Sequence, residues 1–323
     1  RHRSATPPGA RPPARPRRPL PRPRPRRLSR GAGDRARARL TPGDGPHVDD
    51  VTRVGAYREG GRVRCDLRPG ALSPRVLSAS PTTVRIALVA TRALLLGGDR
   101  VRVEVHVGRG VEVELVEVSG TVAYAGRGRS ASWDVAVRVD DDGLLVWDAL
   151  PFVVADGADV DRRTDVRLGR SAVALLRETL VLGRTGERGG RLRSRTRATD
   201  ETGAPRESPD AGGTPRQARE LFVEDLGLGD DRALPGILGD ARVVDSVLCL
   251  GARPPAAHAA APSGPLWLDL DGPGAVVRHL GASTHDAGTD GVVTAWAAAA
   301  RATRGLPDLG LPDHRTALLT TGA

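Results

Sequence analysis

Several residue types are scarce or missing in this chain of 323 residues. No methionine is present, and all 49 basic side chains are arginines, as the codon usage of a GC-rich genome favours. Because methionine is absent, we expect the sequence to be a fragment or to begin at a misassigned start. Aromatic residues make up only 2%, so valine, leucine and alanine must fill the core. The same scarcity disfavours a sugar-binding cleft lined by aromatic rings.

Cysteines and long apolar segments are also rare. The two cysteines, Cys65 and Cys249, lie far apart and form no C-x-x-C pair, which argues against a zinc ribbon or a redox dithiol. Cys249 stands in an apolar run and is expected to be a buried small residue. No segment approaches the ~20 apolar residues of a membrane-spanning helix, and none has the pattern of a signal peptide. We therefore expect a cytoplasmic protein without membrane contact.

The positive charge gathers at one end of the chain. The formal net charge is +10, but residues 1–30 contain 11 arginines and no acidic residue. The rest holds 38 basic and 39 acidic side chains and is close to neutral. Residues 1–45 alternate arginine with proline, and we expect a disordered tail there. A near-neutral body disfavours nucleic acid as a partner, although a binding module whose tail contacts a polyanion stays an alternative.

Between the tail and residue 280, short runs alternate apolar and polar residues and are broken by glycine and proline, which is typical of β-strands. The runs are 61–67, 83–89, 101–107, 111–118, 133–139, 143–147, 165–168, 172–182, 191–197, 241–250, 267–270 and 275–280. No alternation of strands with helices indicates a doubly wound sheet. The sequence therefore predicts an all-β fold.

The clearest pair of runs surrounds the loop 108–110. We expect an antiparallel hairpin in which Val107 pairs with Val111, because all the valines then lie on one face. His106 would face Glu112 across the strands, as a solvated pair.

The β domain is expected to span residues 46–305, with a polar insertion at 202–218 and a loose end at 306–323. An alanine-rich segment with Asp290 as its N-cap predicts one helix near the C-terminus.

Motifs of the common catalytic sites are missing from the sequence. It contains no G-x-S-x-G, H-E-x-x-H, Walker A or G-x-G-x-x-G pattern, and its seven histidines are scattered. Glu178 and Glu187 form an acidic pair, so a β-rich glycoside hydrolase stays a second alternative. We expect no enzymatic activity.

Three segments and the closing helix resemble the UreD family of urease accessory proteins across residues 60–305. The most specific segment runs from Arg177-Glu178 through Gly183-Arg184 to Gly186-Glu187. Leu94–Asp99, which contains Gly97 and Gly98, and Val146–Phe152 support it. The resemblance is to a divergent, GC-rich bacterial branch, and it implies a β-rich, roughly helical stack of strands, either β-helical or sandwich-like.

The resemblance also implies a function and partners. A member of this family is expected to act as a non-enzymatic chaperone that assists nickel insertion into apo-urease, in a complex with UreF-like and UreG-like proteins. Nickel would be in transit, with no cofactor held stably. A carrier of this kind should offer carboxylates and water, which bind the metal weakly.

Three acidic residues in the matching motifs are candidates for a transient nickel path: Asp99, Glu178 and Glu187. The alternative is that Glu187 caps backbone amides of the glycine turn while Arg184 pairs with Glu178. The apolar β-faces and the helix would provide partner surfaces.

Overall fold

The computed structural model describes residues 51–202, 218–255, 264–286 and 289–305. The predicted tail 1–45 and loose end 306–323 lie outside these ranges, as does nearly all of the predicted insertion 202–218. The first strands within the described residues are β1 (Val51–Glu59), β2 (Arg62–Arg68), β3 (Leu72–Ala79), β4 (Thr83–Ala90), β5 (Arg100–Val107), β6 (Glu112–Glu117), β7 (Thr121–Ala123), β8 (Ala131–Val139) and β9 (Leu144–Asp148).

The remaining elements are β10 (Phe152–Val154), β11 (Asp159–Leu168), β12 (Val173–Leu182), β13 (Arg191–Asp200), β14 (Arg219–Leu228), the 3-10 turn η1 (Asp230–Ala233), β15 (Val243–Leu250), β16 (Leu266–Asp269), β17 (Gly274–Gly281), the 3-10 turn η2 (Thr284–Asp286) and α1 (Asp290–Ala302). The all-β prediction is confirmed. Among the described residues, no helix is both long and apolar enough to cross a membrane.

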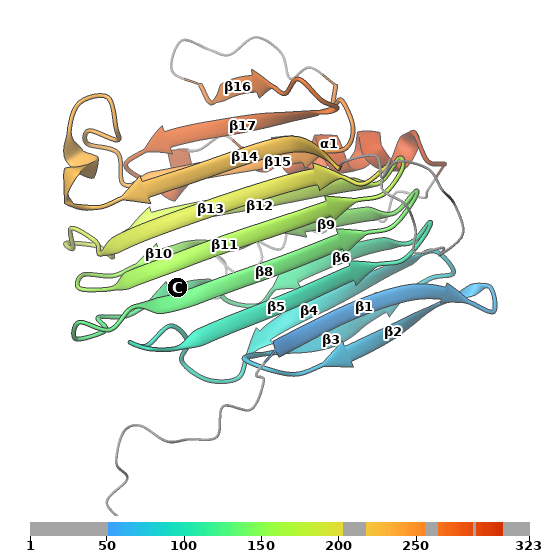
Figure 1. The fold of residues 1–323 in the computed structure, drawn as a ribbon, viewed down its shortest axis with the longest axis horizontal. Coiled ribbons are helices and arrows are strands. Elements are labelled where there is room, and N and C mark those ends of the chain that lie inside the picture. Colours follow the sequence, from blue (N-terminus) through green and yellow to red (C-terminus); the bar gives the residue numbers. More distant parts are fainter. Residues whose placement is uncertain (1–50, 203–217, 256–263, 287–288, 306–323) are drawn as a thin grey trace, which may run out of the picture. The chain divides into compact units, whose positions relative to one another are not determined.

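Two sheets lie one behind the other (Figure 1). The seven-stranded sheet has the order β14-β13-β11-β8-β5-β1-β2, and the ten-stranded sheet has the order β16-β17-β15-β12-β9-β6-β4-β3, with β7 and β10 completing it. In the centre of both sheets neighbouring strands are parallel, as in β5–β8–β11 and β6–β9–β12. The chain thus crosses from one sheet to the other and back, stacking each turn on the last, which is the expected β-helical arrangement.

The predicted hairpin around residues 108–110 is wrong. β5 lies in the seven-stranded sheet and β6 in the ten-stranded sheet, so Gly108–Gly110 carries the chain between sheets. Strand alternation shows which side chains share a face but not which strand lies alongside. In both arrangements the valines point to the same interior, and here they meet across the core.

The predicted neighbour of His106 is also wrong, because its strand does not pair with that of Glu112. The Nε2 atom of His106 lies 2.9 Å from Asp140, and its Nδ1 atom lies 3.0 Å from the Tyr57 hydroxyl. Glu112 is fully buried on the opposite sheet.

Helix α1 packs on the outer side of the ten-stranded sheet. Val293, Trp296 and Ala297 are buried there against an apolar cluster that includes Val247 and Cys249, as predicted for this cysteine. Burial raises the pKa of the Cys249 thiol to about 12.

Ion pairs fasten the helix at both ends. Near its C-terminus, Arg301 Nε donates to Glu112 at 2.7 Å. At its start, Arg177 of β12 bonds to Asp245 and to Asp290. The N-cap position is Thr289, not Asp290 as predicted, and Asp290 lies in the first turn. The pair at the C-terminal end is fully buried, whereas at the start a buried arginine meets Asp290, whose side chain is 71% exposed.

Candidate functional site

The pairing of strands in the ten-stranded sheet is interrupted beside β12. β12 pairs with β9 up to Arg177 and with β10 from Leu180 onward. Between these pairings, the three residues 149–151 lie opposite only two residues of β12, Glu178 and Thr179. One strand therefore has an extra residue, as in a β-bulge. The neighbouring strands β6 and β7 are interrupted at the same level, by residues 118–120.

The Glu117 carboxylate accepts hydrogen bonds from one backbone group and one side-chain group at this break. Its Oε2 atom accepts the backbone N–H of Leu150 at 3.0 Å, and its Oε1 atom accepts the indole N–H of Trp147 at 3.1 Å. Glu117 is buried, so these bonds replace lost water contacts.

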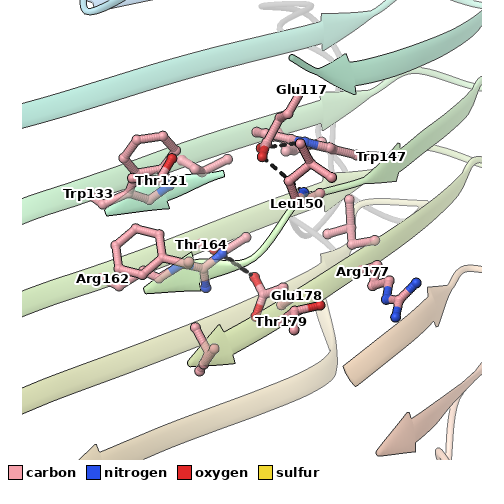
Figure 2. A pocket seen from close by; sticks show the side chains of 16 residues that line it. Glu117, Thr121, Trp133, Trp147, Leu150, Arg162, Thr164, Arg177, Glu178 and Thr179 are labelled. Atoms are coloured by element: carbon pink, nitrogen blue, oxygen red, sulfur yellow. Dashed lines mark hydrogen bonds and ion pairs between the residues drawn. The ribbon is translucent and has the colours of Figure 1, made fainter. Parts of the chain in front are cut away.

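A small cavity lies at this break, between the two sheets (Figure 2). It offers ≈ 40 Å³ to the centres of water molecules, which is space for roughly two to four waters. Apolar and aromatic residues form much of its wall, and the polar residues at it are Glu117, Thr121, Arg162, Thr164, Arg177, Glu178 and Thr179. An interior wall that carries several charged groups is unusual for a β-sandwich core and calls for a functional explanation.

The carboxylate of Glu178 lies at the centre of the cavity's polar groups. Arg162 Nη2 is 2.7 Å from Glu178 Oε1, and the Thr164 hydroxyl donates to the same oxygen at 3.3 Å. Arg162 and Thr164 come from β11 of the seven-stranded sheet, whereas Glu178 comes from β12 of the other. The ion pair therefore joins the two sheets through the core.

Strand register extends these polar groups into a row that runs across the sheets. In the ten-stranded sheet Glu178 stands beside Ser246, and Ser246 stands beside Arg278. In the seven-stranded sheet Thr164 stands beside Thr196, and Thr196 beside Glu224. We call the following nine residues the polar row: Glu117, Arg162, Thr164, Glu178, Ser194, Thr196, Glu224, Ser246 and Arg278.

A second ion pair closes the far end of the polar row. Arg278 donates to both oxygens of Glu224, at 2.6 and 2.9 Å, and its Nε donates to Ser246 at 3.0 Å. Like Arg162 and Glu178, Arg278 and Glu224 come from opposite sheets. A row of hydroxyls and carboxylates thus extends from the cavity to β14, an edge strand, and to β17, which lies next to the edge strand β16.

Of the three predicted path residues, only Glu178 lines the cavity. Asp99 lies in a turn, where its Oδ2 atom accepts the backbone N–H of Leu96 at 3.1 Å. Gly98 has φ +93°, and a Cβ on Gly97 would lie 2.4 Å from the carbonyl oxygen of Gly126 in the next turn. Glycines are needed here for turn geometry and close stacking.

Glu187 belongs to the turn that follows β12. It accepts the backbone N–H groups of Arg184 at 2.9 Å and of Asp156 at 3.2 Å, which ties two successive turns together. The hydrogen bonds from the Arg184 side chain and backbone lower the pKa of Glu187 to about 2. Gly183 and Gly186 both have positive φ in this turn.

These contacts bear on the alternative role that was expected for the glycine turn. Capping of backbone amides by Glu187 is confirmed. The expected pairing of Arg184 with Glu178 is wrong, since Arg184 pairs with Glu187 at 2.8 Å and Glu178 pairs with Arg162. Glu178 points inward because it shares the parity of Leu176 and Leu180, and Arg184 lies beyond the end of its strand.

The acidic pair of the hydrolase alternative is not assembled. Glu178 lines the interior cavity, whereas Glu187 is not among the residues of that cavity. A carboxyl whose pKa is near 2 is ionised at neutral pH and does not serve as a general acid. In the described part of the chain, no group of three or more His, Cys, Asp or Glu side chains is placed to hold a metal ion.

The sequence reasoning missed Glu117, Arg162, Glu224 and Arg278. A signal for Arg162 was present, since it shares the strand parity of Val160 and Val166, which are buried. A charged residue on the apolar face of an alternating strand is the pattern that marks a polar group inside a sheet sandwich.

Comparison with known proteins agrees with the sequence motifs. Residues 53–311 match the family described as UreD urease accessory protein. Urease accessory protein UreD 1 of Streptomyces griseus is 48% identical over 237 residues, which cover 72% of this chain and 85% of that protein. Urease accessory protein UreD of Frankia alni is 38% identical over 267 residues, covering 79% and 85%. UreD 1 of Saccharopolyspora erythraea is 33% identical over 242 residues, covering 71% and 87%. This chain belongs to the UreD family of urease accessory proteins.

Proposed function

We propose that this protein is a non-enzymatic maturation factor for urease, acting as a scaffold and as a conduit for nickel. It would work in the cytoplasm, in a complex with UreF-like and UreG-like proteins that docks on apo-urease. Membership of an accessory family supports the role in maturation. The observation that carries the conduit is the Glu178 carboxylate in a cavity between the sheets.

The chemistry of the polar row suits a metal that must move. Oxygen ligands from carboxylates, hydroxyls and water hold a borderline cation such as Ni²⁺ more weakly than thiolate or imidazole ligands do. Both cysteines lie outside the row, and Cys249 is blocked by burial. Nickel would therefore be cargo and not a resident cofactor.

Of the predicted path residues we retain Glu178 and assign Asp99 and Glu187 to the turns. Both of the latter already accept backbone N–H groups. Gly97, Gly98, Gly183, Arg184 and Gly186 then serve the shape of the turns, and through it the stacking of successive strands.

The test is complementation in a host that has urease but lacks its own UreD. Glu178→Gln removes the charge and keeps the size, and Glu104→Gln changes a partly exposed carboxylate on the outer face as a matched control. We expect Glu178→Gln to lower urease activation about tenfold, a loss of about 1.4 kcal/mol in the delivery step, while Glu104→Gln has no effect. Equal activation by both variants, with equal soluble protein, would refute the conduit.

The scaffold is tested separately by copurification. The wild-type chain and Glu178→Gln should both retain UreF-like protein and urease subunits, because the substituted side chain is interior. Failure of the wild-type chain to retain either partner would contradict the scaffold, whatever the result for the conduit.

A further inference from the structure

Arg162, Arg177 and Arg278 each pair with a carboxylate inside the β-sheets, but they are not bound alike. Arg177 and Arg278 each present two nitrogens to the two oxygens of one carboxylate. Arg162 presents a single nitrogen to Glu178, at 2.7 Å, and a second nitrogen to the Ser194 hydroxyl at 3.3 Å. Its Nε is buried and has no hydrogen-bond partner among the described residues. Arg162 is thus the most loosely held of the three.

The Arg162 guanidinium lies beside a cavity and an aromatic ring. Arg162, Glu178 and Phe152 all line the cavity of ≈ 40 Å³, and Figure 2 shows the two charged side chains side by side. The Arg162 Cζ atom is 5.9 Å from the centre of the Phe152 ring, within range of a cation–π contact. Arg162 therefore already has contacts other than the carboxylate, to the Phe152 ring and to Ser194, at the wall of an interior cavity.

We propose that Arg162 is a built-in cation that occupies Glu178 until a divalent cation replaces it, so that the cavity is gated by exchange. That the divalent cation is nickel rests on the proposed function. In the resting state the guanidinium neutralises Glu178 in the core. In the exchanged state Glu178, the Thr164 hydroxyl and cavity waters hold the metal, and Arg162 rests on Phe152 and Ser194.

The exchange explains how a buried carboxylate could carry a metal without trapping it. A guanidinium that stays a few ångströms away repels the bound cation, and the repulsion is strong where little water screens it. Binding is weak as a result, and the returning arginine favours release. Replacing Arg162 by a neutral side chain should turn the site from one that passes a cation into one that keeps it.

The test is Ni²⁺ binding to the purified full-length chain by equilibrium dialysis against nickel chloride. Arg162→Gln should raise the affinity for Ni²⁺ by about tenfold or more, because a nearby like charge is removed. The gain should vanish in Arg162→Gln/Glu178→Gln. Arg53→Gln, which removes an exposed arginine paired with Glu104 on the outer face, should leave the affinity at the wild-type value.

Two further measurements complete the test: Ni²⁺ binding by Arg162→Lys, which keeps the positive charge, and tryptophan fluorescence of the wild-type chain. Arg162→Lys should bind Ni²⁺ like the wild type, since the positive charge stays. In the wild-type chain, high Ni²⁺ should quench tryptophan fluorescence from Trp133 and Trp147, which line the cavity, and Glu178→Gln should abolish that quenching. The second measurement applies even if Arg162→Gln does not fold.

The outcomes separate this inference from the proposed function. A folded Arg162→Gln chain that gains no affinity, or a gain that survives in the double variant, overturns the exchange. If Arg162→Gln does not fold, wild-type quenching that persists in Glu178→Gln overturns it. Tight binding by Arg162→Gln together with urease activation that is indifferent to Glu178→Gln would confirm the exchange and contradict the nickel conduit.

Discussion

The cost of breaking the Arg177–Asp245 pair follows from its burial. The two side chains are only 1% and 0% exposed, and they meet through two bonds of 3.0 and 2.7 Å. Burial alone would raise the pKa of Asp245, but the hydrogen bonds and charge of Arg177 override it, and the pKa is lowered. Arg177→Met leaves that carboxylate buried without its cation, and we expect the free energy of unfolding to fall by about 3–5 kcal/mol.

The chain contains a matched control on its outer face. Arg193 and Asp225 also meet through two bonds, of 3.0 and 2.6 Å, but their side chains are 57% and 48% exposed. Arg193→Met should therefore change the stability little, because water takes over the contacts of an exposed pair.

Urea denaturation of both variants, followed by circular dichroism, measures the difference. The double variant Arg177→Met/Asp245→Leu should recover most of the loss, since a buried apolar pair needs no compensation. Equal losses for Arg177→Met and Arg193→Met would refute the reasoning that burial decides the value of an ion pair in this fold.

Three further predictions concern the turns, the pH dependence and the thiols. Gly97→Ala places a Cβ 2.4 Å from a backbone oxygen and should lower the melting temperature. In Gly291→Ala the new Cβ meets nothing within 4 Å in α1, so this variant should raise the free energy of unfolding by roughly 0.4–1 kcal/mol. Calorimetry of both variants measures the difference. Glu187 has a pKa lowered from 4.5 to about 2, so its stabilising contribution is complete above pH 4.5 and lost as the pH falls toward 2. The stability difference between wild type and Glu187→Gln should shrink over that range, and a difference that stays constant would contradict the assignment. Cys65 is half-buried and Cys249 is buried with a pKa near 12, so a thiol reagent should modify Cys65 first in the native protein, as mass spectrometry of the peptides will show.

Strand faces could be read from the sequence because their period is local. Val101, Val103, Val105 and Val107 are all buried, as their alternation predicted. The partner of each strand could not be read, because β5 lies alongside β1 and β8, far from it in sequence. A hairpin and a pair of stacked sheets would both bury a face of valines, so the pattern does not distinguish them.

The candidate site was predictable only in part, for a related reason. Glu178 was selected through its motif, but its partner Arg162 comes from the previous strand of the other sheet. The pairing depends on which strands face each other across the core. For Glu187, by contrast, the capping contacts are local, within the turn and its neighbour, and the turn chemistry of the sequence sufficed.

The nickel content of urease after maturation tests the central claim most directly. Apo-urease is incubated with nickel and with complexes that contain the wild-type chain or Glu178→Gln at equal amounts, and nickel per active site is measured after gel filtration. Glu178→Gln should form the complex yet deliver much less nickel than wild type. If urease matured with Glu178→Gln holds as much nickel, delivered as fast, the polar row is not the path.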